Sequence, residues 1–209
     1  MFAPSLDEEL WRIGKPKLTG KGIYQRKDGD PIRIGYVGNP TDLANLEMIA
    51  DAMKKIEQEF GEKVEIEVIG GFQNTKPLFG KRVGLPKKDD YPNFVDWLQR
   101  RVHWDIGIIP LINSGFSKGK SHLKFIEYTA LSLSVVVSNI ESDSGIYRNY
   151  ENAIVVDNTV EQWYESLRQL IISIESRDKI LKKAKSDLIE MHCIGSSDTL
   201  VSVIKNNLE

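Results

Sequence analysis

Cysteine is almost absent from this 209-residue sequence, since Cys193 is the only one. A lone cysteine cannot form a disulfide within the chain, so the covalent cross-links of small secreted domains are excluded. The N-terminus, MFAPSLDEELW, lacks the charged and then apolar order of a signal peptide, and no apolar run reaches the length of a membrane span. We therefore expect a protein of the reducing cytoplasm.

An excess of charge of one sign is also missing. The 28 basic and 30 acidic residues give a formal net charge of −2, and the two signs are intermixed along the chain. This pattern predicts no basic face for a nucleic acid. An apolar content of 41% is typical of an ordinary globular protein that can bury a full core.

Residues that bind metals are few and poorly spaced. The three histidines, His103, His122 and His192, lack ligand spacing, so each is expected at the surface or at a helix end. Asp28 and Asp30 form an Asp-x-Asp sequence, but a proline follows it and it precedes the first predicted strand, which favours a turn. We therefore expect no metal and no other cofactor.

Apolar runs and helical repeats alternate along most of the chain. The apolar runs, expected as buried strands, cover residues 32–37, 64–69, 105–110, 135–137 and 154–156, with a weaker one at 82–85. Helical spacing covers residues 43–56, 92–102, 123–130, 160–174, 177–191 and 198–207. This alternation predicts an α/β fold, a doubly wound Rossmann-like parallel sheet with helices on both faces. No linker divides residues 31–209, which are predicted to form one domain.

Residues 1–30 show neither pattern. They hold a short helical candidate from Leu6 to Trp11, with Ser5 as its candidate cap, and then a run of Gly, Lys and Asp. We expect a lead-in segment ahead of the domain.

Residues 105–139 join a predicted strand, a loop, a helix and a second strand. The loop follows the carboxyl end of a strand and precedes a helix, which is where parallel sheets bind ligands. Lysines and small polar residues surround the start of this helix and suit a phosphate-like anion: Ser117, Lys118, Lys120, Ser121 and Lys124. A simpler interpretation stays open, in which these side chains cap the helix and form a solvated face.

Glu127 differs from this positive set. A carboxylate beside a phosphate site needs another partner, and the hydroxyl groups of a ribose are the expected one. The alternative is a solvated helix residue paired with Lys124. A nicotinamide cofactor is not expected, because the sequence from Gly35 to Gly38 lacks the third glycine of a dinucleotide fingerprint.

The stretch KSHLKFIEYTALSLSVVVSN resembles the donor-site segment of the retaining group-one glycosyltransferases. That pattern is a glutamate, seven residues, a second glutamate and then Ala-x-x-x-Gly-x-Pro-Val. Glu127 falls on the second glutamate, while Val135 and Val136 fall on the valine-rich strand after it. The stretch is closer still to a bacterial surface-polysaccharide branch of the family, which runs roughly Lys-Ser-x-Leu-Lys-Phe-x-Glu-Tyr.

Several positions depart from the family pattern. Gly119 stands in place of the first glutamate, and Ser132 and Ser134 replace the Gly and Pro of Gly-x-Pro. The turn after the first strand is similar to the family's Val-Gly-Arg turn, but Asn39 follows Gly38 where the family has an arginine that holds the donor diphosphate. The positive charge is expected instead from Lys118, Lys120 and Lys124.

The resemblance implies the second half of a two-domain (GT-B) fold, which binds a nucleotide-sugar donor. Glu127 would accept hydrogen bonds from the ribose hydroxyls. The diphosphate would be held by the three lysines and Ser121, by the backbone at His122 and Leu123, and by the facing turn at Gly38 and Asn39. The resemblance gives no settled catalytic residue.

The expected function is therefore donor binding in a retaining glycosyltransferase of bacterial cell-surface polysaccharide synthesis (O-antigen, capsule or exopolysaccharide), inactive as an isolated half. The expected partners are a nucleoside diphosphate sugar, an N-terminal acceptor-binding domain and a glycan or lipid-linked acceptor. Peripheral attachment at the inner membrane is an option for the full-length enzyme. The alternative is a non-catalytic nucleotide-binding or regulatory module on the same fold, which the replaced first glutamate favours.

Overall fold

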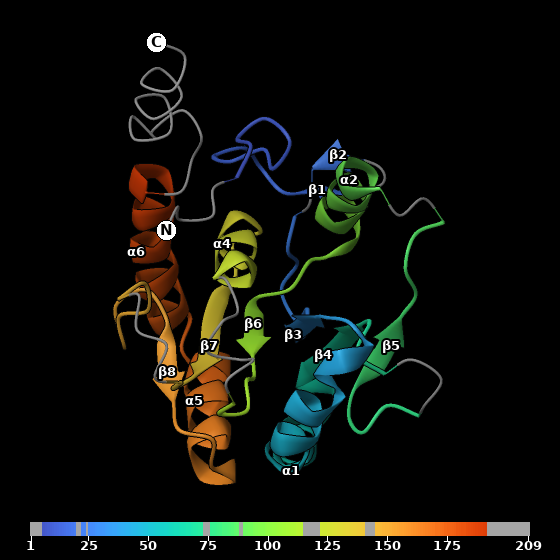
Figure 1. Cartoon of the computed structure of the whole chain (residues 1–209), viewed down its shortest axis with the longest axis vertical. Helices are drawn as coiled ribbons and strands as arrows, with labels where there is room; N and C mark the ends of the chain where they lie inside the picture. Colours follow the sequence, from blue (N-terminus) through green and yellow to red (C-terminus); the bar gives the residue numbers. More distant parts are fainter. Residues whose placement is uncertain are drawn as a thin grey trace.

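A parallel sheet of six strands organises the part of the chain that the computed structural model describes, residues 6–19, 22–23, 25–72, 76–87, 90–114, 122–140 and 145–191 (Figure 1). The strands are β3 (Ile32–Val37), β4 (Val64–Ile69), β5 (Lys81–Val83), β6 (Ile106–Ile109), β7 (Ser134–Ser138) and β8 (Ile154–Val156). A separate antiparallel hairpin, β1 (Leu18–Thr19) and β2 (Gly22–Ile23), precedes the sheet.

The strand order in the sheet is β5-β4-β3-β6-β7-β8, and every neighbouring pair is parallel. The first strand of the sheet, β3, lies in its middle. The chain adds β4 and β5 on one side of β3, and then adds β6, β7 and β8 in order on the other side. This order confirms the predicted doubly wound fold. The strand order reverses between β3 and β6, which makes the carboxyl ends of these two strands the topological switch point.

The helices cover both faces of the sheet. They are α1 (Leu43–Phe60), α2 (Tyr91–Arg101), α4 (Leu123–Ala130), α5 (Val160–Ile172) and α6 (Ile174–Met191), with short 3-10 turns η1 (Pro40–Asp42) and η2 (Gly61–Lys63). Buried side chains of α1 and α5 form a core with one face of the strands, and those of α2 and α4 form a second core with the other. In Figure 1, α6 lies beside α4, which it contacts. Among the described helices, none is both long enough and apolar enough to cross a membrane.

Two glycines in the central strands make room for aromatic rings. A Cβ atom on Gly35 of β3 would lie 1.7 Å from Cδ2 of Trp104, and one on Gly107 of β6 would lie 2.4 Å from Cδ2 of Tyr128. The two rings meet edge to face, with centroids 6.5 Å apart. Both strands therefore carry glycine because the rings rest directly on their backbones.

Both rings also use their polar atoms. The hydroxyl of Tyr128 accepts a hydrogen bond from the backbone N–H of Val37 at 2.8 Å, at the end of β3. The indole N–H of Trp104 donates to the buried carboxylate of Glu67 in β4 at 2.7 Å. The rings consequently connect α4 with β3 and, through Trp104, with β4.

The lead-in segment packs against the second core. Leu6 and Trp11 are buried within that core. The predicted helix from Leu6 to Trp11 is wrong: residues 8–14 form turns, with Asp7 Oδ1 accepting the N–H groups of Glu9 and Leu10, both at 2.9 Å. A positive φ of 51° at Arg12 prevents the turns from continuing as a helix. The candidate cap Ser5 lies outside the described residues.

Lys17 attaches this segment to the sheet. Its ammonium group donates to the backbone carbonyl of Trp104 at 3.0 Å. Burial lowers the pKa of Lys17 to about 8. The lead-in segment therefore contributes both apolar and polar contacts to the domain.

The last two helices differ from prediction at their junction. The helix predicted at 160–174 is too long, because α5 ends at Ile172 and α6 begins at Ile174. The side chain of Ile174 is 56% exposed, so it does not continue the buried face of α5. Ser173 separates the helices, and its hydroxyl accepts the N–H of Ser176 at 3.1 Å, as a helix cap does. The last predicted helix, at 198–207, lies outside the described residues.

The packing of the Trp104 ring against Gly35 of β3 gives a direct test of the fold. Gly35→Ala should lower the free energy of unfolding by roughly 3 kcal/mol, because the new methyl group must displace a buried ring. For a chain of this size the melting temperature should fall by about 6–12 °C. Gly84→Ala is the control, since a Cβ there meets nothing within 4 Å. Equal melting temperatures for the two variants would contradict the seating of the ring.

Candidate functional site

Six of the nine predicted site residues belong to the described part of the chain, and these six lie where β3 and β6 end. The chain leaves β3 toward α1 on one face of the sheet and leaves β6 toward α4 on the other. We call residues 36–45 and 122–128 the switch-point edge. It holds Gly38, Asn39, His122, Leu123, Lys124 and Glu127 of the predicted site. The other predicted residues, Lys118, Lys120 and Ser121, lie outside the described residues, as does Ser117.

Gly38 and Asn39 form a tight turn after β3. The N–H of Gly38 donates to the carbonyl of Ile69 at 2.9 Å, which ties the turn to the end of β4. The side-chain oxygen of Asn39 accepts the N–H of Thr41 at 3.0 Å. The N–H of Asn39 donates to Asp42 Oδ2 at 3.2 Å. Asn39 thus stabilises the path into α1, and its contact with a diphosphate stays a prediction.

Lys124 lies over Tyr36 and close to Asp42. Its ammonium nitrogen is 4.4 Å from the centre of the Tyr36 ring and donates to the Tyr36 hydroxyl at 3.3 Å. Asp42 Oδ2 is 3.9 Å away, on a side chain that is 3% exposed. Lys124 therefore balances the charge of a buried carboxylate, which the sequence did not reveal.

The remaining contacts of Asp42 support this arrangement. Its Oδ1 accepts from the amide of Asn45 at 3.3 Å. Tyr36 is hydrogen-bonded to Asp42, and burial, followed by the charge of Asp42, raises the pKa of the Tyr36 hydroxyl. The Tyr36 hydroxyl consequently stays protonated near neutral pH.

Glu127 lies one helical turn after Lys124. Its Oε1 accepts a hydrogen bond from the hydroxyl of Tyr91, the first residue of α2, at 3.1 Å. Burial raises the pKa of Glu127, whereas the hydrogen bond from Tyr91 and the charge of Lys124 act in the opposite direction. The carboxylate is therefore partly withdrawn from water, yet keeps a donor and a cation that favour its charged form.

The start of α4 is fixed by His122. Its carbonyl accepts the N–H groups of Phe125 at 3.0 Å and Ile126 at 3.3 Å. Its ring nitrogen Nδ1 lies 3.0 Å from the hydroxyl of Tyr147, and the two rings meet edge to face. The first N–H groups of a helix lack carbonyl partners within it and attract anions. The backbone at His122 and Leu123 accordingly remains a candidate for anion binding.

Metal-ligating side chains do not cluster in the described residues: no group of three or more His, Cys, Asp or Glu is placed to hold an ion there. Asp28 and Asp30 belong to a turn, as predicted. The N–H of Asp30 donates to the carbonyl of Lys27 at 3.1 Å, and its carboxylate accepts the N–H of Lys27 at 2.9 Å.

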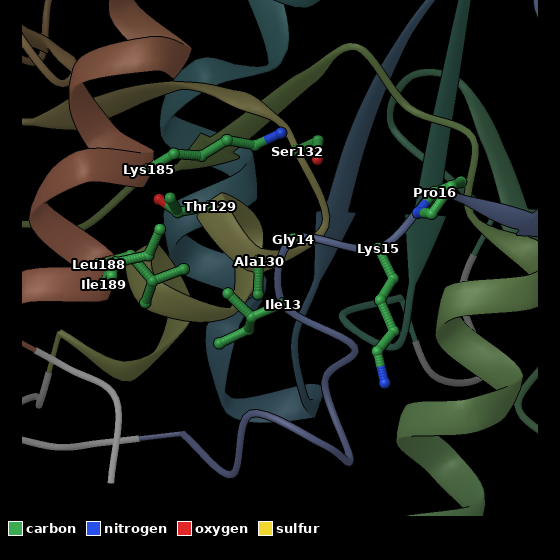
Figure 2. A pocket seen from close by; sticks show the side chains of 10 residues that line it. All are labelled: Ile13, Gly14, Lys15, Pro16, Thr129, Ala130, Ser132, Lys185, Leu188 and Ile189. Atoms are coloured by element: carbon green, nitrogen blue, oxygen red, sulfur yellow. The ribbon is translucent and has the colours of Figure 1, made fainter. Parts of the chain in front are cut away.

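A pocket of about 320 Å³ lies at the opposite end of α4, between the lead-in segment and α6 (Figure 2). Its lining residues are Ile13, Gly14, Lys15, Pro16, Thr129, Ala130, Ser132, Lys185, Leu188 and Ile189. Figure 2 shows Lys185 extending toward Ser132, whereas Lys15 points away from the pocket. Burial lowers the pKa of Lys185. Of the predicted donor-site residues that the structure describes, none lines this pocket.

The fold defines the class of protein as a doubly wound α/β domain. Within that class, the sequence pattern of the family described as "Glycosyl transferases group 1" matches residues 31–173, more than half of the chain. The chain belongs to this family. Among curated proteins, none matches the sequence.

Solved structures share the fold at low sequence identity. A glycosyltransferase from Rickettsia africae ESF-5 superposes with a TM-score of 0.62 at 13% identity, over 86% of this chain and 48% of that one. Anabaena Alr3699/HepE, in complex with UDP and glucose, gives 0.61 at 10% identity, over 85% and 48%. The C-terminal domain of a group 1 glycosyl transferase (LpcC) from Francisella tularensis gives 0.56 at 17%, over 92% and 96%. The chain thus spans about half of the first two proteins and nearly all of a single C-terminal domain.

The charge balance at Asp42 gives a second test. Lys124→Met should lower the free energy of unfolding by about 2 kcal/mol, because it removes a positive charge beside a buried carboxylate. The double variant Lys124→Met with Asp42→Asn should recover most of that loss. Lys54→Met, which removes an exposed ion pair with Asp51, should change stability by less than about 1 kcal/mol. Chemical unfolding that finds the two lysine variants equally stable would contradict the pairing.

Proposed function

We propose that this domain binds the nucleotide-sugar donor of a retaining glycosyltransferase, similar to enzymes that build bacterial cell-surface polysaccharide. The observation that carries the proposal is the state of Glu127: a carboxylate partly buried at the switch-point edge, with Oε1 held by Tyr91, on a domain of the group 1 family. A second carboxylate oxygen in that position suits the hydroxyl groups of a ribose. The relative that binds UDP and glucose supports the choice of donor.

In this proposal the diphosphate lies at the start of α4. The N–H groups of the first helical turn and the dipole of the helix favour an anion there. Lys118, Lys120 and Lys124 supply positive charge, although Lys124 shares its charge with Asp42. When the glycosidic bond breaks, negative charge grows on the leaving diphosphate, and these same groups stabilise it. We propose no metal in this role.

Transfer needs a second surface for the acceptor. The chain spans about half of the Rickettsia and Anabaena proteins and nearly all of the Francisella C-terminal domain. We therefore assign this chain to the donor half, with a glycan or lipid-linked acceptor bound by a first domain. In such enzymes the reaction takes place between the two halves, where closure excludes water and aligns the acceptor hydroxyl.

A non-catalytic nucleotide-binding or regulatory module remains the second candidate. It is favoured by Gly119, which stands where the family pattern has its first glutamate. The two candidates share nucleotide binding and differ in sugar transfer.

Nucleotide binding is the first expected result. The domain should be stabilised by a nucleoside diphosphate in a thermal-shift panel of UDP, GDP, TDP, ADP and CMP. A ligand at 100 times its dissociation constant adds about 2.7 kcal/mol, which raises the melting temperature by roughly 5–10 °C. EDTA should leave the shift unchanged, because lysines and a helix terminus neutralise the phosphates. The absence of any shift at millimolar nucleotide would contradict the proposal, and rescue by magnesium after chelation would contradict its metal-free form.

Sugar transfer is expected only when the two halves are combined. The isolated chain should transfer no sugar from a nucleotide donor, because the acceptor has no site and the donor stays open to water. Fusing it to the acceptor-binding domain of a related enzyme, or supplying that domain separately, should create activity that neither piece has alone. Robust transfer by the isolated chain would contradict the assignment as a donor half. A fusion that binds nucleotide but never transfers sugar would favour the non-catalytic module.

A further inference from the structure

A chain of hydrogen bonds links the lead-in segment to the donor-site glutamate. The indole N–H of Trp11 donates to the hydroxyl of Tyr91 at 3.2 Å. That hydroxyl donates in turn to Oε1 of Glu127 at 3.1 Å. The three residues come from the lead-in segment, α2 and α4, and are 80 and 36 positions apart in sequence.

The chemistry of the groups fixes the direction of both bonds. An indole nitrogen can only donate, and a phenol carries a single proton. Because Trp11 occupies the acceptor side of the Tyr91 hydroxyl, the proton of that hydroxyl is directed to Glu127. A carboxylate that accepts a hydrogen bond is stabilised in its charged form.

We call the hydrogen-bonded chain Trp11–Tyr91–Glu127 the relay. Its first two members are held in place by the surrounding fold. Trp11 is 2% exposed and lies in the second core. Tyr91 begins α2, where the side chain of Asp90 accepts the N–H of Asn93 at 3.2 Å and its amide group at 2.6 Å. The two aromatic rings lie with centroids 6.5 Å apart. The Tyr91 hydroxyl is therefore held from the lead-in side and from its own helix.

The relay leaves one oxygen of Glu127 for a ligand. Among the described residues, no hydrogen bond reaches Oε2. The titratable groups that act on Glu127 are Tyr91 from α2, Lys124 on its own helix and the adjacent Tyr128. Lys118 and Lys120 lie outside the described residues. One oxygen is thus fixed in place while the other stays available.

We propose that Tyr91 is a positioning residue for donor binding, which holds Glu127 with Oε2 available to the ribose, and that Trp11 sets the direction of the Tyr91 hydroxyl. This inference rests on the proposed function. It makes the lead-in segment part of the donor site, although that segment precedes the region that matches the family.

The test compares conservative variants with two ligands. The ligands are the nucleoside diphosphate of the panel that stabilises the wild type and its 2′,3′-dideoxy counterpart. Tyr91→Phe should weaken binding of the ribose nucleotide about tenfold, the usual scale for a hydrogen bond to a charged group, and change binding of the dideoxy nucleotide less than about twofold. Trp11→Phe should show a smaller loss with the same ribose dependence. Tyr150→Phe is the matched control, since Tyr150 is 52% exposed.

The pH dependence of nucleotide affinity distinguishes loss of the Tyr91–Glu127 hydrogen bond from a general loosening of the fold. Glu127 must be ionised to accept both ribose hydroxyls, so affinity is present above its pKa and lost as pH falls through it. Burial raises that pKa and the Tyr91 hydrogen bond opposes the rise. Tyr91→Phe should therefore move the midpoint of the affinity profile to higher pH, whereas Tyr150→Phe should leave it in place. Melting temperatures of the variants control for folding.

The outcomes distinguish this inference from the function on which it rests. If the wild type binds no nucleotide, both are overturned. If the wild type binds and Glu127→Gln weakens the ribose nucleotide selectively, but Tyr91→Phe behaves like Tyr150→Phe, the relay is overturned and the proposed function stands. A loss for Tyr91→Phe that is equal for the ribose and dideoxy ligands also overturns the relay.

Discussion

The seating of Trp104 and Tyr128 on the glycines of β3 and β6 is the constraint on which the switch-point edge depends. Strand backbones that carry side chains at these positions would push both rings away. With the rings in place, the Tyr128 hydroxyl binds the last N–H of β3 and fixes α4 in rotation about its axis. Glu127 is the residue before Tyr128, so its direction follows from the packing of its neighbour. The geometry of the switch-point edge is therefore a consequence of the core.

Buried carboxylates form a second layer of constraint. Asp42 and Glu67 are each about 3% exposed, and each has polar partners: Lys124 and Asn45 for the first, Trp104, Arg101 and Lys81 for the second. A buried charge is costly unless it is paired, so these contacts restrict which side chains the edge accepts. Lys124 consequently has a structural role as the partner of Asp42. A bound diphosphate would interact with the same ammonium group. Asn39, which stands where the family pattern has an arginine, also has a structural role: its N–H donates to Asp42 and its side-chain oxygen accepts the N–H of Thr41.

Much of the fold could be predicted because buried parallel strands appear as short, mainly apolar runs. The predicted strands at 32–37, 64–69 and 154–156 coincide with β3, β4 and β8. Contacts between side chains of different helices and strands leave no such periodic signal in the sequence. Asp42 looks like any polar residue at a helix start, and nothing in the sequence connects Trp11 or Tyr91 with Glu127. Ile174 was misplaced because an apolar side chain continued the helical spacing past a serine that caps the next helix. Three of the predicted diphosphate ligands fall outside the described residues, so their roles stay predictions.

We expect a nucleotide to bind at the switch-point edge with its ribose on Glu127. A crystal structure of the domain with the nucleoside diphosphate that stabilises it tests this most directly. We expect a ribose hydroxyl within about 3 Å of Glu127 Oε2, with Oε1 still bonded to Tyr91 and the phosphates at the first turn of α4. A nucleotide found instead in the pocket between the lead-in segment and α6, or one whose ribose points away from Glu127, would contradict it.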